Sequence, residues 1–174
     1  FDSFMVSNTF SGFQIDSGGN VALERVRAGY CVSNAVYASG NTRLTLARSI
    51  LEQSLFNGVQ ANTGAVVVAV GSLMRGNGVA NVNVRGGNVD VYNGILEADG
   101  SQRYVYYLGN SGKLSSDYNN VRVSAGASVG GGVARAAERF LIDWQIGTSF
   151  SNDVNSFGYE ADFADAAALD FHLK

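Results

Sequence analysis

The chain has no proline in 174 residues, although it contains 22 glycines and 16 asparagines. Ordinary usage of about 5% would give about eight or nine prolines at this length. Proline lacks a backbone N–H and often blocks stray pairing at the exposed edges of sheets. Because a strand-rich chain without proline keeps all of its backbone donors, we expect strands whose edges are able to pair with other copies.

Short segments of alternating apolar and polar residues recur about every 8–14 residues, with glycine-rich turns between them. Residues 79–84 and 89–92 alternate on either side of such a turn and predict a hairpin. No fixed repeat of about 20–50 residues is evident, which argues against a solenoid or a propeller. The pattern predicts an all-β, mainly antiparallel fold, a β-sandwich or jelly roll with at most one or two short helices.

Two segments fit more than one kind of structure. Residues 42–56 begin with strand-like alternation, but their apolar residues also share one helical face, so helix and strand both remain open. Residues 133–144 start with a helical pattern and end with one that favours a strand. We expect a single domain over residues 1–174, with the glycine triplet Gly130–Gly132 as a hinge.

Composition favours an extracellular or cell-surface protein. Only 16% of the residues are charged, the net charge is −3, and polarity comes mainly from Ser, Asn, Thr and Gly. The chain has no basic tract, so nucleic acid is not an expected partner. No apolar run reaches the roughly 18 residues that a membrane-spanning helix needs, so we expect no membrane span.

Catalytic and redox motifs are scarce. The only cysteine, Cys31, lies in an apolar segment and is expected to be a buried, small side chain. The only histidine, His172, is expected at the surface, and no nucleophile elbow accompanies it. We therefore predict a protein that is not an enzyme and needs no cofactor, with calcium as the one exception to consider.

The C-terminal stretch is rich in acidic residues, and oxygen ligands are what calcium prefers. The candidate ligands are Asp153, Asn155, Asp162 and Asp165. The alternative is a solvated acidic strand face. Three aromatic residues are candidates for stacking on a glycan, namely Trp144, Tyr104 and Tyr106, with packing inside the protein as the alternative.

The two ends of the chain resemble a known class of secreted proteins. Residues 1–4 (FDSF) and residues 156–171 (SFGYEADFADAAALDF) are similar to secreted bacterial β-sandwich surface proteins of the exosortase-sorted, PEP-CTERM type. The resemblance implies export and a role at the cell surface or in a matrix. It assigns no catalytic residue.

Two functions follow from these features. The first is an extracellular structural subunit, a homo-oligomer or homopolymer that forms a fibre, pilus or surface layer by strand addition. Apolar residues near both ends would form its interface, namely Phe1, Phe4, Val6, Phe10, Phe13, Leu169, Phe171 and Leu173. The second is a carbohydrate-binding surface module that acts on surface glycans.

Overall fold

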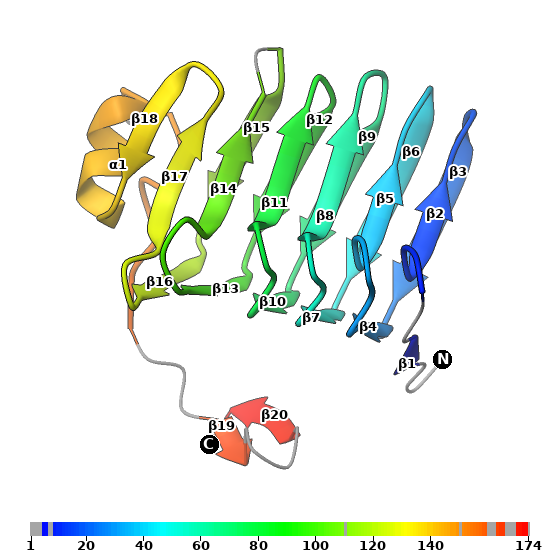
Figure 1. The fold of residues 1–174 in the computed structure, drawn as a ribbon, viewed down its shortest axis with the longest axis horizontal. Coiled ribbons are helices and arrows are strands. Elements are labelled where there is room, and N and C mark those ends of the chain that lie inside the picture. Colours follow the sequence, from blue (N-terminus) through cyan, green and yellow to red (C-terminus); the bar gives the residue numbers. More distant parts are fainter. Residues whose placement is uncertain are drawn as a thin grey trace.

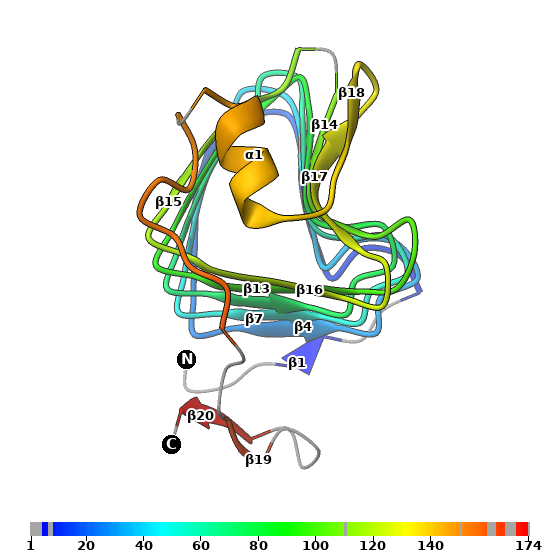
Figure 2. The same cartoon turned by 90° about the vertical axis from the view of Figure 1, so that its left-hand side faces the viewer.

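The computed structural model describes residues 5–6, 9–109, 111–149, 151–159, 163–165 and 170–173. The chain visits three sheets in turn, which we call A, B and C, and each circuit adds one strand to each sheet (Figures 1 and 2). Figure 2 looks along the stack of circuits, with sheet A at the bottom, sheet C on the left and sheet B on the right. The fold is therefore a parallel β-solenoid.

Sheet A consists, in spatial order, of β1 (Met5–Val6), β4 (Arg27–Gly29), β7 (Ile50–Glu52), β10 (Leu73–Arg75), β13 (Ile95–Asp99) and β16 (Asn120–Ser124). Sheet B consists of β2 (Phe13–Ile15), β5 (Val36–Ala38), β8 (Asn57–Asn62), β11 (Ala80–Arg85), β14 (Tyr104–Leu108), β17 (Ser128–Gly132) and β18 (Arg135–Glu138). Sheet C consists of β3 (Gly19–Glu24), β6 (Thr42–Ala47), β9 (Val66–Val70), β12 (Asn88–Tyr92) and β15 (Lys113–Asp117).

The prediction of an antiparallel β-sandwich or jelly roll is wrong. Neighbouring strands in the three sheets are parallel, apart from β18. Val36 pairs with Val59 and Val59 with Val82, so equivalent residues recur one coil apart. The spacing is 23 residues between the corner residues Ser49 and Ser72 and 25 between Gly94 and Asn119. This repeat, which varies in length and in residue identity, overturns the expectation that the chain is not a solenoid.

The expected hairpin at residues 79–92 is a solenoid corner instead. β11 and β12 lie in different sheets, and each pairs with strands of the coils before and after it. The alternation correctly indicates two strands. The partners of those strands, however, are one coil away rather than across the turn.

The core fills the space between the three sheets and is built from columns of inward-facing side chains. One column runs through Leu51, Met74 and Leu96, all fully buried, and their strands are in register. In residues 42–56, β6 buries Leu44 and Leu46 while Leu55 is 64% exposed. This stretch therefore forms the strands β6 and β7 and no helix, because its apolar residues do not share one buried helical face.

Buried polar groups bind successive coils to one another. The Ser49 hydroxyl accepts a bond from the Val26 N–H, and the Ser72 hydroxyl accepts one from the Ser49 N–H, each at 3.2 Å. In sheet A, the fully buried Glu52 accepts hydrogen bonds from Arg27 at 2.7 Å and from Arg75 at 3.2 Å. Pairing on both sides offsets the cost of burying this carboxylate.

The C-terminal end of the solenoid is covered. β18 turns back antiparallel to β17, and the helix α1 (Leu141–Gly147) lies across the end of the core (Figure 2). The order predicted for residues 133–144 is thus reversed, since the strand comes first and the helix second. The glycine triplet is part of β17, where a Cβ on Gly130 would lie 2.0 Å from the Trp144 ring. This glycine permits the close approach of the Trp144 ring, and a hinge at the triplet stays a prediction.

Residues beyond the cap form a separate hairpin of β19 (Phe163–Asp165) and β20 (Asp170–Leu173), which pair with each other in antiparallel fashion. At the opposite end, β2 and β3 are the outermost strands of sheets B and C in the part of the chain that is described. No helix among the described residues is long and apolar enough to cross a bilayer.

Candidate functional site

Two of the three aromatic residues predicted to stack on a glycan are buried. Trp144 and Tyr106 are both 0% exposed and stack on each other with ring centroids 5.4 Å apart. The Arg135 guanidinium lies 4.8 Å from the Trp144 ring. Tyr104 is half-buried and packs edge-on against Tyr107. Trp144 and Tyr106 therefore build the cap and present no ring to a ligand.

Asp153, the first candidate calcium ligand, is the centre of the same cap. Its buried carboxylate accepts hydrogen bonds from the Ser116 hydroxyl at 2.7 Å, the Ser156 hydroxyl at 2.7 Å and Trp144 Nε1 at 3.0 Å. Further bonds come from Asn119 Nδ2 at 3.2 Å and the Tyr106 hydroxyl at 3.3 Å. Both of its oxygens are occupied by protein donors, which suits a structural anchor.

The protonation of Tyr106 fits this arrangement. Burial raises the pKa of the Tyr106 hydroxyl well above its usual value, and the negative charge of Asp153 raises it further. The phenol thus remains neutral and can donate to Asp153. The donors to the Asp153 carboxylate come from α1, from β14 and β15, from the turn after β15 and from the segment after α1.

The other calcium candidates do not join Asp153. Asn155 is exposed and uses its backbone N–H and its side-chain amide to bind Asp117. Asp162 lies outside the described residues, and Asp165 lies in β19, where side chains are not described. Across the described part of the chain, no group of three or more His, Cys, Asp or Glu side chains is arranged to hold a metal ion. Calcium binding stays a prediction.

The predicted interface residues are spread over both ends. Phe1, Phe4 and Leu169 lie outside the described residues, and the side chains of Val6, Phe171 and Leu173 are not described either. Phe13 packs partly buried against the core, whereas Phe10 is 61% exposed. Cys31, as expected, is a buried free cysteine.

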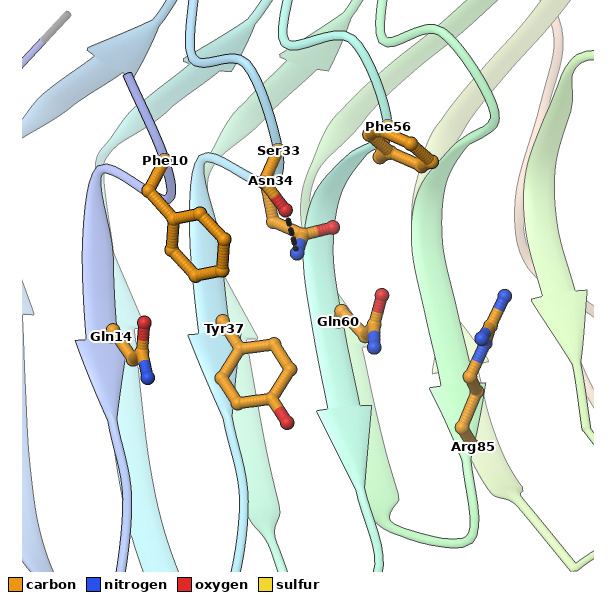
Figure 3. A pocket seen from close by; sticks show the side chains of 8 residues that line it. All are labelled: Phe10, Gln14, Ser33, Asn34, Tyr37, Phe56, Gln60 and Arg85. Carbon is orange, nitrogen blue, oxygen red and sulfur yellow. Dashed lines mark hydrogen bonds between the residues drawn. The ribbon is translucent and has the colours of Figure 1, made fainter. Parts of the chain in front are cut away.

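A groove on the outer face of sheet B brings together side chains from the first four coils. It has a volume of about 310 Å³. Figure 3 shows Gln14, Tyr37 and Gln60 projecting from neighbouring strands, with Phe10 and Phe56 above them and Arg85 on the right. The lining residues are Phe10, Gln14, Ser33, Asn34, Tyr37, Phe56, Gln60 and Arg85.

The groove follows from the coil geometry. Gln14, Tyr37 and Gln60 are equivalent positions of β2, β5 and β8, so their side chains lie in one outward-facing column. Adjacent strands are about 4.8 Å apart, and the column therefore offers a polar group at this interval. The corner before sheet B supplies the opposite wall, where the 52% exposed Phe56 stands two coils from Phe10.

Hydrogen bonds between side chains hold the floor of the groove. Asn83 donates to Asn57 at 3.2 Å, and Asn57 donates to Asn34 at 2.7 Å. Asn57 also donates to Gln60, which donates to Asn62 at 3.1 Å. The bonds from Asn83 through Asn57 to Asn34 join three coils, and those from Asn57 through Gln60 to Asn62 run along β8. The groove is therefore preorganised before any ligand arrives.

This network ends at a phenol. Asn62 Nδ2 donates to the Tyr37 hydroxyl at 2.8 Å, so the phenol oxygen is held in place as an acceptor. Its own O–H remains available to donate to a ligand, since no described side chain is recorded as accepting from it. Tyr37 therefore offers both a ring face and an oriented donor.

Charge is distributed unevenly along the groove. Arg85 is exposed and makes no recorded ion pair with any described residue. Asp16 lies beyond the far end, where a hydrogen bond from Ser39 and a second from Gln14 lower the pKa of its carboxyl group. Among the residues that line the groove, Arg85 is the only cation and none is acidic.

A second hollow of about 210 Å³ lies on the outer side of sheet A and is lined by Gln53, Arg75, Gly76, Glu97 and Asp99. Its cation, Arg75, is already bound to the buried Glu52. This hollow also lacks an aromatic wall. We consider the groove on sheet B the better candidate site.

Sequence reasoning missed every groove residue except Phe10, which it assigned to an interface. The signal was present but depended on the repeat. Phe10 and Phe56 are two coil lengths apart, as are Gln14 and Gln60, and the pairing of β2, β5 and β8 places them side by side. Without the coil length, these residues look scattered.

Comparisons with protein families, with curated proteins and with solved structures found no match to this chain.

Proposed function

We propose that this protein is an extracellular binding module that holds a carbohydrate chain in the groove on sheet B. Low charge content and abundant Ser and Asn support the extracellular location. The observation that carries the proposal is the combination of exposed aromatic rings with a bonded row of amides in one groove. We expect binding without turnover of the ligand.

The chemistry of the groove fits a sugar in two ways. The C–H faces of pyranose rings pack well on aromatic rings, and Phe10, Tyr37 and Phe56 supply such surfaces. Sugar hydroxyls both donate and accept, and they can bond to the Tyr37 phenol and to the hydrogen-bonding capacity that Gln14 and Gln60 do not use within the protein. The volume also lies at the lower end of the range for ligand pockets. The rigid strand spacing favours an extended chain over a single compact ligand.

The test is a panel of soluble oligosaccharides measured by isothermal titration calorimetry. Removing the central ring with Tyr37→Ala is expected to weaken binding about tenfold. Tyr92→Ala is the matched control, because Tyr92 occupies the outer face of sheet C and its hydroxyl bonds to Ser115. Equal affinities for the two variants would contradict the groove as the site, and a panel without any binding would contradict the function.

Self-assembly is a second candidate, supported by the contrast between the two ends of the solenoid. Val21 and Leu23 in the outermost strand of sheet C are only partly buried, whereas Leu44 and Leu46 in the next coil are fully buried. A second copy could cover this edge by strand pairing. Because β18 and α1 cover the other end, such pairing would join two N-terminal ends into a dimer. A fibre, pilus or surface layer would need additional contacts.

Size-exclusion chromatography with light scattering tests this candidate. We expect a dimer that Leu23→Lys converts to a monomer, because the new charge would be buried in the pairing edge. Thr45→Lys is the control, since Thr45 faces outward on the next strand of the same sheet. A monomer at every protein concentration would contradict assembly through this edge.

A further inference from the structure

We propose that the carbohydrate held in the groove is acidic, and that Arg85 binds one of its carboxylate groups. This inference rests on the proposed function and specifies the class of glycan. It starts from the polar groups that the groove leaves available. Arg85 offers guanidinium N–H groups, and Tyr37 offers a phenol O–H whose oxygen is already held by Asn62. Both are donors, so the matching ligand group is an acceptor.

The amides of the groove contribute less to the recognition of a ligand, because they already form hydrogen bonds within the protein. Gln60 accepts from Asn57 and donates to Asn62, and Gln14 donates to Asp16 at 2.6 Å. Asn34 accepts from Asn57 and donates to the Ser33 hydroxyl at 3.0 Å. The groove thus presents its uncommitted cation and its oriented phenol as the dominant recognition groups.

The cation is not neutralised from within the groove. No lining residue is acidic. Asp16 follows β2 directly and bonds to Ser39, so it continues, three coils away, the row of outward positions that ends at Asn62 and Arg85. Three coil steps separate Asp16 from Arg85, which is about 14 Å at about 4.8 Å per step. This exceeds the Debye length of about 8 Å at physiological salt, so repulsion of a ligand carboxylate bound at Arg85 is largely screened.

The positions of the two donors also suit a polymer. Tyr37 and Arg85 lie on strands two coils apart, a separation of about 10 Å along the groove. One sugar ring packed on Tyr37 would place a later ring of an extended chain beside Arg85. A guanidinium group binds a carboxylate through two parallel, charge-assisted hydrogen bonds, so the contact is directional as well as strong.

A matched pair of ligands tests the inference, namely a hexamer of uronic acid residues and the same hexamer with its carboxyl groups reduced to alcohols. We expect the native protein to bind the acidic hexamer about tenfold more tightly than the reduced one. Arg85→Gln is expected to abolish this preference while both hexamers still bind. High salt should reduce the preference in the native protein.

Arg43→Gln is the control variant, because Arg43 is exposed on the outer face of sheet C and changes the net charge equally. It should retain the full preference. If the native protein binds both hexamers with equal affinity, or if Arg43→Gln loses the preference as Arg85→Gln does, the inference is wrong while the carbohydrate function stands. If neither hexamer nor any neutral glycan binds, the proposed function itself is wrong.

Discussion

The C-terminal cap and the groove on sheet B are both rich in aromatic and polar residues, but they use them in opposite ways. In the cap, Trp144 and Tyr106 are fully buried and the carboxylate of Asp153 is surrounded by protein donors. In the groove, Phe10 is mostly exposed and Arg85 has no recorded partner among the described residues. Residue type therefore does not distinguish structural from binding roles here; exposure and unused hydrogen-bonding capacity do.

This difference has an energetic meaning. A buried polar group without a partner costs about 1–3 kcal/mol, so removing one member of the cap network leaves others unsatisfied. Truncating a groove side chain that already faces solvent costs little folding stability. Mutations in the cap should therefore reduce stability, and mutations in the groove should reduce binding.

The largest expected effect is that of Trp144→Ala in the cap. We expect the free energy of unfolding to fall by about 3–5 kcal/mol, because the variant leaves a cavity beside Tyr106 and removes a donor from Asp153. Urea denaturation measures the change. Ile142→Ala is the control on the same helix, since Ile142 is 53% exposed and should cost less than about 1 kcal/mol. A similar loss in both variants would show that the cap is not packed as described.

A smaller effect on stability is expected for Phe10→Ala in the groove. Its ring is 61% exposed, so the free energy of unfolding should change by less than about 1 kcal/mol. Glycan affinity, measured by calorimetry on the same protein, should fall severalfold. The comparison between the two regions would fail if Phe10→Ala destabilised the fold strongly or left glycan binding unchanged.

The smallest effect concerns Asp117, which ties the segment after α1 to sheet C. Burial alone would raise the pKa of its carboxyl group, but hydrogen bonds from Asn155 and from the Tyr118 N–H outweigh burial and lower it. A lowered pKa in the folded state stabilises the protein above the unfolded value of about 3.9 and loses this contribution as pH falls through the folded value.

We therefore expect the native protein to be more stable than Asp117→Asn at neutral pH by less than about 1 kcal/mol. The difference should shrink below about pH 4, where the native carboxylate becomes protonated. Urea denaturation at neutral and at acidic pH measures it. A difference that grows on acidification would contradict the assigned direction of the pKa shift.

Local structure could be predicted from the sequence much better than its arrangement. The alternation at residues 79–84 correctly indicates a strand, and glycine-rich turns correctly indicate corners. Parallel pairing was missed because equivalent positions keep their apolar character and not their identity, as in the column Ala28, Leu51 and Met74. An alternating strand looks the same whether its partner lies across a turn or one coil away.

The candidate site was missed for a related physical reason. A groove formed by stacked coils combines residues that only the coil length relates, so Tyr37 and Arg85 cannot be associated from the sequence alone. Trp144 is a candidate glycan contact by residue type, with burial as the alternative, and nothing near it in the sequence indicates that Gly130 provides the space that buries it.

The most direct test of this account is to titrate isotopically labelled protein with the uronic acid hexamer and to map the changes in backbone amide NMR signals. We expect the largest changes at Phe10, Gln14, Asn34, Tyr37, Gln60 and Arg85, with the signals of Trp144 and Asp153 unaffected. Changes centred on the cap or on sheet C, with the groove signals unmoved, would contradict the central claim.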